Sequence, residues 1–93
     1  MGKRVKVMRD CPLRNKLGMH ARPASMIAQI ANRFQSDISI TKDGQDTDGK
    51  SVMGLLMLAA EQGSVLSITA HGEDALEALD AIEKLIAGKF GED

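Results

Sequence analysis

The chain has 93 residues, 43% of them hydrophobic, and a formal net charge of −1. This length fits one small domain with a single core, and we expect residues 1–93 to form it. Because 12 Lys and Arg are balanced by 13 Asp and Glu, the charge argues against nucleic-acid or membrane-surface binding, which needs a positive excess. The two aromatic residues, both Phe, give no platform for stacking bases.

The cysteine count and the hydropathy exclude further classes of protein. Cys11 is the only cysteine, which excludes an internal disulfide and a multi-thiolate metal site within one chain. No apolar stretch approaches the roughly 18 residues of a membrane span, and the N-terminal residues lack the apolar core of a signal peptide. We therefore expect a cytoplasmic protein without membrane insertion.

The first half of the chain predicts a strand, a helix and a hairpin. Val5 and Val7 alternate with charged residues, as in a short half-buried strand, and a loop is expected from Cys11 to Gly18. Asp43-Gly44 is typical of a tight hairpin turn, between a strand containing Ile38 and Ile40 and a polar edge strand at 45–48. Before that hairpin, from Ala21 onward, apolar residues follow a helical period: Ala24, Ile27, Ala28, Ala31 and Phe34.

The second half predicts a helix, a strand and a last helix. The apolar run 52–60 favours a helix capped by Ser51, with Gly63 as its stop. Residues 65–70 alternate as a fourth strand, and Gly72-Glu73-Asp74 opens the last helix with acid at its positive end. The buried stripe of that helix is expected to consist of Ala75, Leu79, Ile82 and Ile86.

Strands with one apolar face and helices with one apolar stripe pack most simply as two layers. The order strand-helix-strand-strand-helix-strand-helix therefore predicts an α+β open-faced sandwich. In it, a four-stranded, largely antiparallel sheet is covered on one face by three helices.

His20 lies directly before the first helix, where the amides of Ala21 and Arg22 have no partner inside the helix. Such a helix end attracts anions, and the Arg22 guanidinium suits phosphate oxygens. The positive end of the helix also disfavours a charged imidazole, so His20 can act as a neutral nucleophile. From the local pattern alone, the alternative is an incidental histidine at a helix start beside a surface arginine. If His20 is functional, this arrangement predicts phosphoryl transfer without a metal ion, in which Ala21 and Arg22 bind the phosphoryl oxygens.

Residues 15–24, Asn-Lys-Leu-Gly-Met-His-Ala-Arg-Pro-Ala, resemble the active-site segment of the HPr/NPr family. These are phosphocarrier proteins of the bacterial phosphoenolpyruvate-dependent phosphotransferase system. Ser51-Val52-Met53-Gly54 is similar to the regulatory-serine helix of that family, and residues 62–74 match its last strand and helix start. The resemblance runs from Val5 to Phe90, and the known fold of the family agrees with the sandwich predicted from the pattern.

The resemblance implies a stoichiometric carrier that is not an enzyme and needs no cofactor or metal. His20 would accept a phosphoryl group on Nδ1 from phospho-Enzyme I, assisted by Arg22, and pass it to an EIIA-type protein in sugar uptake or nitrogen-related regulation. Some paralogues lack the histidine and only regulate, whereas this chain keeps it. Residues 16–20 and 51–58 look closer to the nitrogen-related carriers, but the sequence does not identify the acceptor.

Ser51 has two interpretations. As a local pattern it is an N-cap hydroxyl, and the resemblance implies a site for an HPr kinase/phosphorylase. The alternative to a carrier is accordingly a regulatory binding domain that acts through Ser51 phosphorylation and protein docking. Because the helix after Ser51 is apolar nearly all round, we expect an exposed docking surface beside His20, with candidates Met19, Met26, Val52, Met53 and Leu56.

Cys11 and His71 are the remaining reactive side chains. A catalytic thiol or a metal pair at these residues is the alternative hypothesis, and the sequence offers it no third ligand or organised partner. We expect a monomer.

Overall fold

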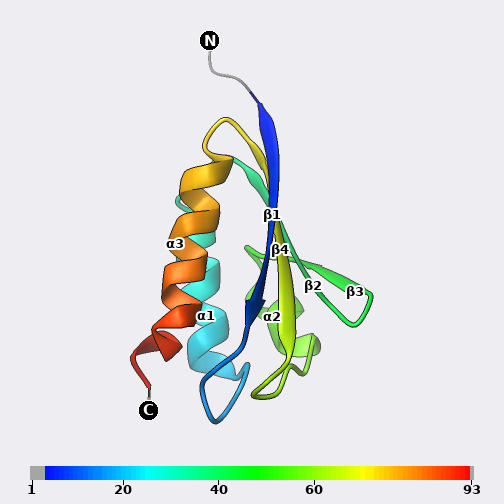
Figure 1. The fold of residues 1–93 in the computed structure, drawn as a ribbon, viewed down its shortest axis with the longest axis vertical. Helices are drawn as coiled ribbons and strands as arrows, with labels where there is room; N and C mark the ends of the chain where they lie inside the picture. The colour runs from blue at the N-terminus through cyan, green and yellow to red at the C-terminus, as the bar shows by residue number, and fades with distance from the viewer. Residues whose placement is uncertain (1–3, 93) are drawn as a thin grey trace.

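The computed structural model describes residues 4–92, drawn in Figure 1. The chain forms, in order, β1 (Val5–Pro12), α1 (Ala21–Ala31), β2 (Asp37–Lys42), β3 (Gln45–Asp48), α2 (Val52–Met57), β4 (Val65–Gly72), α3 (Ala75–Ala87) and a short 3₁₀ turn (Lys89–Gly91). The predicted order of elements is therefore confirmed.

The four strands form one antiparallel sheet in the order β1-β4-β2-β3. Alternate residues of the central strands point into the core, among them Ile38, Ile40, Leu66 and Ile68, each at most 4% exposed. Helices α1 and α3 lie along one face of this sheet (Figure 1), and their predicted apolar stripes are buried, except that Phe34 lies beyond the end of α1 and is only partly buried. The open-faced sandwich is confirmed, and it brings the start of α1 and the segment after α3 to the same end of the molecule.

Strand β1 is longer than the sequence predicts. It continues through Cys11 and Pro12, which we expected in a loop, because β4 offers an eight-residue partner from Val65 to Gly72. The alternation is hard to recognise because Arg9 occupies the inner face. Its guanidinium donates hydrogen bonds to Asp80 (2.9 Å) and Glu83 (2.6 Å) of α3, which makes a charge acceptable at this position.

Helix α2 is shorter than the sequence predicts. It ends at Met57 and not near Gly63, and Ala59 adopts a left-handed conformation with φ +50°. The chain leaves the helix to bury Leu58 and Ala60, and the Ala60 carbonyl accepts a hydrogen bond from the Met19 amide at 2.8 Å. Gly63 instead occupies the turn before β4, with φ +92°.

The hairpin prediction is confirmed, since Asp43 (φ +50°) and Gly44 (φ +79°) join β2 to β3 with both residues in the left-handed region. Among the helices of residues 4–92, none is long and apolar enough to span a lipid bilayer.

Candidate functional site

His20 occupies the N-cap position of α1, where the chain changes from an extended to a helical conformation. Its backbone is extended (φ −121°, ψ −170°), and its carbonyl accepts the first helical hydrogen bond from the Ala24 amide at 3.0 Å. The imidazole makes no capping bond, and the side chain is 36% exposed. A half-exposed ring therefore lies beside the first amides of the helix, those of Ala21 and Arg22, which have no partner within the helix.

The loop that leads to His20 is fixed by its neighbours. Gly18 adopts φ +67°, and a Cβ atom there would lie 2.5 Å from the Ala60 carbonyl oxygen, so glycine is required. The next residue, Met19, is buried and is held by its backbone bond to Ala60. The segment at residues 60–62 thus holds in place the two residues that precede the imidazole.

Glu92, which follows α3, contacts the imidazole directly. Its Oε2 lies 2.9 Å from His20 Nε2, and its Oε1 accepts a hydrogen bond from Asn15 Nδ2 at 2.9 Å. The carboxylate is an acceptor only, so Nε2 must carry the proton in this contact. A neutral ring in this arrangement has its lone pair on Nδ1.

Asn15 anchors this carboxylate from inside the protein. Its side chain is fully buried, and its amide nitrogen also donates to the Gly18 carbonyl at 2.8 Å. Both neighbours of this nitrogen are acceptors, which fixes the orientation of the amide group. The Oδ1 atom of Asn15 is buried and has no hydrogen-bond partner within residues 4–92.

The tail reaches His20 because its backbone turns sharply after α3. Lys89 and Phe90 both have φ +56°, and Gly91 has φ +74°. Left-handed conformations are unfavourable for residues with a Cβ atom, so another interaction must hold this turn. The Phe90 side chain, only 1% exposed, supplies it by entering the core.

Arg22 lines the same open pocket as His20 and Glu92, together with Lys16 and Leu17. The pKa of Glu92 lies below its ordinary value, chiefly because Asn15 donates a hydrogen bond to it. The bond from His20 and the charges of His20 and Arg22 act in the same direction, whereas desolvation opposes them. The pocket thus combines a histidine at a helix N-terminus with the cationic Lys16 and Arg22 and the carboxylate of Glu92, and the cations and the helix N-terminus favour an anion there.

The structure corrects part of the predicted docking surface. Met19 is 7% exposed and belongs to the core, so it cannot form such a surface. Met26, Val52 and Leu56 are only partly exposed and pack against the core, whereas Met53 is 69% exposed as expected. Leu17 (74%), in the loop before His20, and Met57 (69%), in α2, are also exposed and were not among the predicted candidates.

Ser51 caps α2. Its Oγ accepts a hydrogen bond from the Gly54 amide at 3.0 Å, and the side chain is partly buried. The capping interpretation is confirmed. Gly54 itself allows α2 to approach β3, because a Cβ atom at this position would overlap Thr47 Oγ1.

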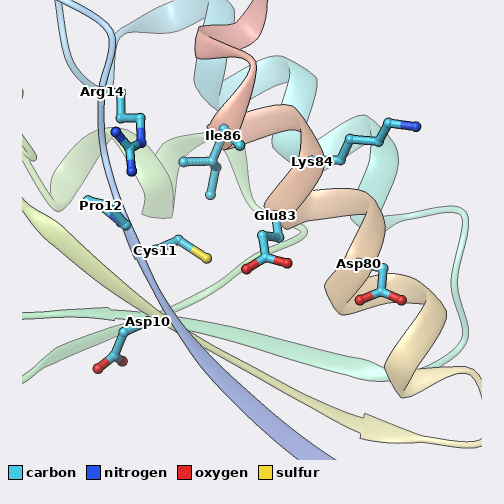
Figure 2. Close-up of a pocket in the computed structure, with 9 residues that line it drawn as sticks. Asp10, Cys11, Pro12, Arg14, Asp80, Glu83, Lys84 and Ile86 are labelled. Atoms are coloured by element: carbon cyan, nitrogen blue, oxygen red, sulfur yellow. The ribbon is translucent and has the colours of Figure 1, made fainter.

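Cys11 lies at a second pocket, formed between β1 and α3 and shown in Figure 2. Its sulfur is directed toward α3 and is nearly inaccessible, since the residue is 3% exposed. Burial raises the pKa of the Cys11 thiol, and the nearby charge of Glu83 raises it further. A protonated, buried thiol is a poor nucleophile, so the structure does not favour a catalytic cysteine.

The metal hypothesis fails on the sheet register. Cys11 pairs with Leu66 and faces the core, whereas His71 pairs with Lys6 near the other end of the strands and is exposed. Within residues 4–92, no three His, Cys, Asp or Glu side chains form a group that could hold a metal ion.

Sequence reasoning missed Asn15, Glu92, Lys16 and Leu17 as site residues. The available signal was Phe90, a lone aromatic residue after the glycine that ends α3, since an apolar residue in a polar tail indicates docking on the core. Nothing local predicts that Glu92 contacts a residue 72 positions earlier.

The comparisons with known proteins agree with this geometry. Residues 7–88 match the family model described as "PTS HPr component phosphorylation site". The chain is 43% identical to the phosphocarrier protein HPr of Cupriavidus necator, over 92% of this chain and 97% of that protein. It is also 43% identical to the phosphocarrier protein NPr of Proteus mirabilis, covering 91% and 96% of the two chains.

A solved structure of HPr-C-His from Thermoanaerobacter tengcongensis superposes with a TM-score of 0.85 at 41% identity, covering 98% of each chain. The equal identities to an HPr and an NPr do not distinguish a sugar from a nitrogen branch. Taken with the histidine at the start of α1 and the confirmed sandwich, these matches show that the chain belongs to the HPr/NPr family of phosphotransferase-system phosphocarrier proteins.

Proposed function

We propose that His20 accepts a phosphoryl group on Nδ1 from phospho-Enzyme I and passes it to an EIIA-type protein. The observation that carries this proposal is the contact between His20 Nε2 and Glu92 Oε2 at 2.9 Å. It occupies one ring nitrogen and leaves the other, Nδ1, with a lone pair in a half-exposed side chain. Family membership supports the carrier role, and the donor, the acceptor and the reacting atom are our proposal.

The transfer itself asks little covalent chemistry of the protein. Phosphoryl transfer depends mainly on in-line positioning and on stabilising the charge of the moving group. The amides of Ala21 and Arg22 can donate to the phosphoryl oxygens, and the Arg22 guanidinium adds a full positive charge. Binding must remain moderate, since an over-stabilised phosphohistidine would not pass its group on.

The candidates for contacts with partner proteins are apolar side chains that are exposed. Leu17 lines the His20 pocket and Met53 lies on α2, and both are more than two-thirds exposed. We propose that these apolar side chains contact Enzyme I and the EIIA-type protein around the phosphorylated ring, because flexible apolar residues adapt to unrelated partners. The protein is proposed to act as a monomer.

The test is incubation with phosphoenolpyruvate and Enzyme I, followed by phosphorus NMR. Wild-type protein should gain one acid-labile phosphate with the spectrum of an Nδ1-linked phosphohistidine. His20→Ala should gain none, and His71→Ala is the matched control because it removes the only other histidine, at an exposed strand position. Absence of phosphate on the wild type, under conditions that charge a known carrier, would exclude the proposal.

The role proposed for Arg22 is tested separately. Arg22→Ala should keep the fold, since the side chain is exposed, and slow phosphoryl transfer by about 10- to 100-fold through loss of a charged donor. Arg22→Lys, which keeps the charge but not the two-pronged geometry, should recover part of the rate. Equal rates for all three proteins in both directions would show that the guanidinium does not assist.

The alternative is a regulatory binding domain in which Ser51 is phosphorylated and His20 is not. The partly buried Ser51 hydroxyl is engaged by the Gly54 amide, so a kinase would have to break this cap. Mass spectrometry after incubation with HPr kinase and ATP separates the two functions. Phosphate on Ser51 of the wild type, absent in Ser51→Ala, together with an unmodified His20 after the Enzyme I reaction would favour the alternative.

A further inference from the structure

We propose that Asn15 and Glu92 act as a positioning pair that keeps a proton on His20 Nε2 both before and after phosphorylation. The inference rests on the proposed function, because it assigns these residues a part in the reaction at His20. It concerns residues outside the histidine, the arginine and the helix amides.

The two oxygens of Glu92 have separate partners. Oε1 accepts from Asn15 Nδ2 and Oε2 contacts His20 Nε2, both at 2.9 Å. The Glu92 side chain is only 14% exposed, so it is held between these partners and does not extend into solvent. The carboxylate therefore presents one defined oxygen to the imidazole.

Asn15 provides the fixed end of this arrangement. It is fully buried, and its second hydrogen bond, to the Gly18 carbonyl, ties it to the loop that carries His20. The amide cannot rotate without turning its oxygen toward two acceptors. The left-handed turn at Lys89 and Phe90 directs the tail back toward this amide, with Phe90 buried in the core.

The chemistry explains why a carboxylate is useful at this ring nitrogen. When the Nδ1 lone pair attacks phosphorus, the bond between phosphorus and the donor breaks and its electron pair leaves with the donor. The His20 ring now has phosphorus on Nδ1 and hydrogen on Nε2, and it carries a positive charge. Glu92 balances that charge, which the N-terminus of α1 disfavours.

The same proton serves the second transfer. When the acceptor attacks phosphorus, the Nδ1–P bond breaks and its electron pair returns to Nδ1. Because Nε2 has kept its hydrogen, the leaving group is a neutral imidazole and not an imidazolate. No proton enters or leaves the site in either direction.

The experiment measures the tautomer and the rate separately. Ring ¹⁵N chemical shifts of His20, recorded at a pH where the ring is neutral, should show the proton mostly on Nε2 in the wild type. In Glu92→Ala the two tautomers should become mixed, and transfer should slow by about 10- to 100-fold, the effect of a hydrogen bond to a charged group. Glu92→Gln offers one acceptor oxygen to two donors, Asn15 Nδ2 and His20 Nε2, so it should keep the tautomer only in part and should lose rate.

Asn15 is tested by a double-mutant cycle. If it acts through Glu92, Asn15→Ala slows transfer in the wild-type background and has no added effect in Glu92→Ala. A merely structural role would give the same loss in both backgrounds. Glu77→Ala, which removes an exposed carboxylate of α3, is the matched control and should change neither the tautomer nor the rate.

The outcomes distinguish this inference from the proposed function. A wild type that takes up phosphate while Glu92→Ala keeps its tautomer and its rate overturns the positioning pair and leaves the carrier intact. A wild type that takes up no phosphate overturns the carrier and, with it, the pair's part in transfer. Mixed tautomers in the wild type overturn the pair whatever the rates.

Discussion

The substitution Gly54→Ala should have two opposite effects on stability, one from helix propensity and one from packing. Within a helix, alanine is favoured over glycine by about 1 kcal/mol, so helix propensity alone predicts a more stable protein. The structure predicts the reverse. Gly54 lies in the first turn of α2 against β3, and a Cβ atom there would overlap Thr47 Oγ1.

A small movement of Thr47 does not relieve this overlap. Thr47 is β-branched and half-buried, and its Cβ atom would lie 3.3 Å from the new methyl group, so rotating the side chain does not clear the space. Overpacking of this kind costs about 1–3 kcal/mol, and the rigid neighbour places this site toward the upper end. The expected net effect is a loss of about 1–2 kcal/mol of unfolding free energy.

Thermal and urea unfolding of four proteins would test this reasoning: wild type, Gly54→Ala, Thr47→Ala and the double variant. For a domain of this size, each kcal/mol shifts Tm by about 4–8 °C. Gly54→Ala should melt lower than wild type, and in the Thr47→Ala background, which lacks the overlapping Oγ1 but keeps Cβ, the same change should lower Tm by less. An increase in Tm for Gly54→Ala in both backgrounds would show that α2 and β3 are not in close contact.

Three further predictions concern the cap, the acid limit and the thiol. Ser51→Ala should lower the unfolding free energy by about 1 kcal/mol through loss of the bond to the Gly54 amide, while Ser51→Asp keeps a capping oxygen and most of the stability; equal losses for both would contradict the cap. The pKa of Asp74 is lowered, chiefly by the Ser36 hydroxyl and then by the Gln35 amide. The ionised carboxylate therefore stabilises the fold fully above its unfolded-state pKa of about 3.9. This stabilisation is lost as the pH falls through the lower folded-state pKa. Urea unfolding from pH 7 to pH 2 should therefore show a smaller acid loss in Asp74→Asn than in the wild type, and parallel curves would refute this account. Cys11 should react with a thiol reagent only on the timescale of unfolding, and rapid labelling of the folded protein would mean that its pocket opens.

The fold was predictable where a residue pattern repeats over several turns or strand positions. The stripes of α1 and α3 and the alternation in β2 and β4 continue long enough to identify each element. The Asp43-Gly44 turn also has a direct physical requirement, two residues in the left-handed region. These local signals agree with one another, and two-layer packing then leaves few arrangements.

The errors have a common cause, a long-range contact that overrides the local pattern. Arg9 breaks the apolar alternation on the inner face of β1, and its partners on α3 are more than 70 positions away in the sequence. The apolar run after Ser51 looked like a longer helix, because nothing local indicates that Ala60 will pair with Met19. Met19 and Met53 are equally apolar, and only the packing of the loop decides that one is buried and the other exposed.

The candidate site also has one part that the local sequence predicts and one part that depends on a long-range contact. His20, Ala21 and Arg22 are adjacent, so a helix start with unpaired amides was enough to predict an anion site around the histidine. Glu92 completes the site from the other end of the sequence, 72 positions away from His20. Its contribution could not be predicted from local pattern, since exposed glutamates are common and only the tail conformation distinguishes this one.

That conformation argues that Glu92 is held in place for its contact with the ring. Two successive non-glycine residues, Lys89 and Phe90, are left-handed, at about 1–2 kcal/mol each. Burial of the Phe90 side chain returns about 1.5–3 kcal/mol, so the turn is close to neutral overall. A tail without a specific contact would stay extended, with neither left-handed residues nor a buried Phe90. In this chain, the turn brings a carboxylate of lowered pKa to Nε2 of the one histidine that lies at a helix N-terminus.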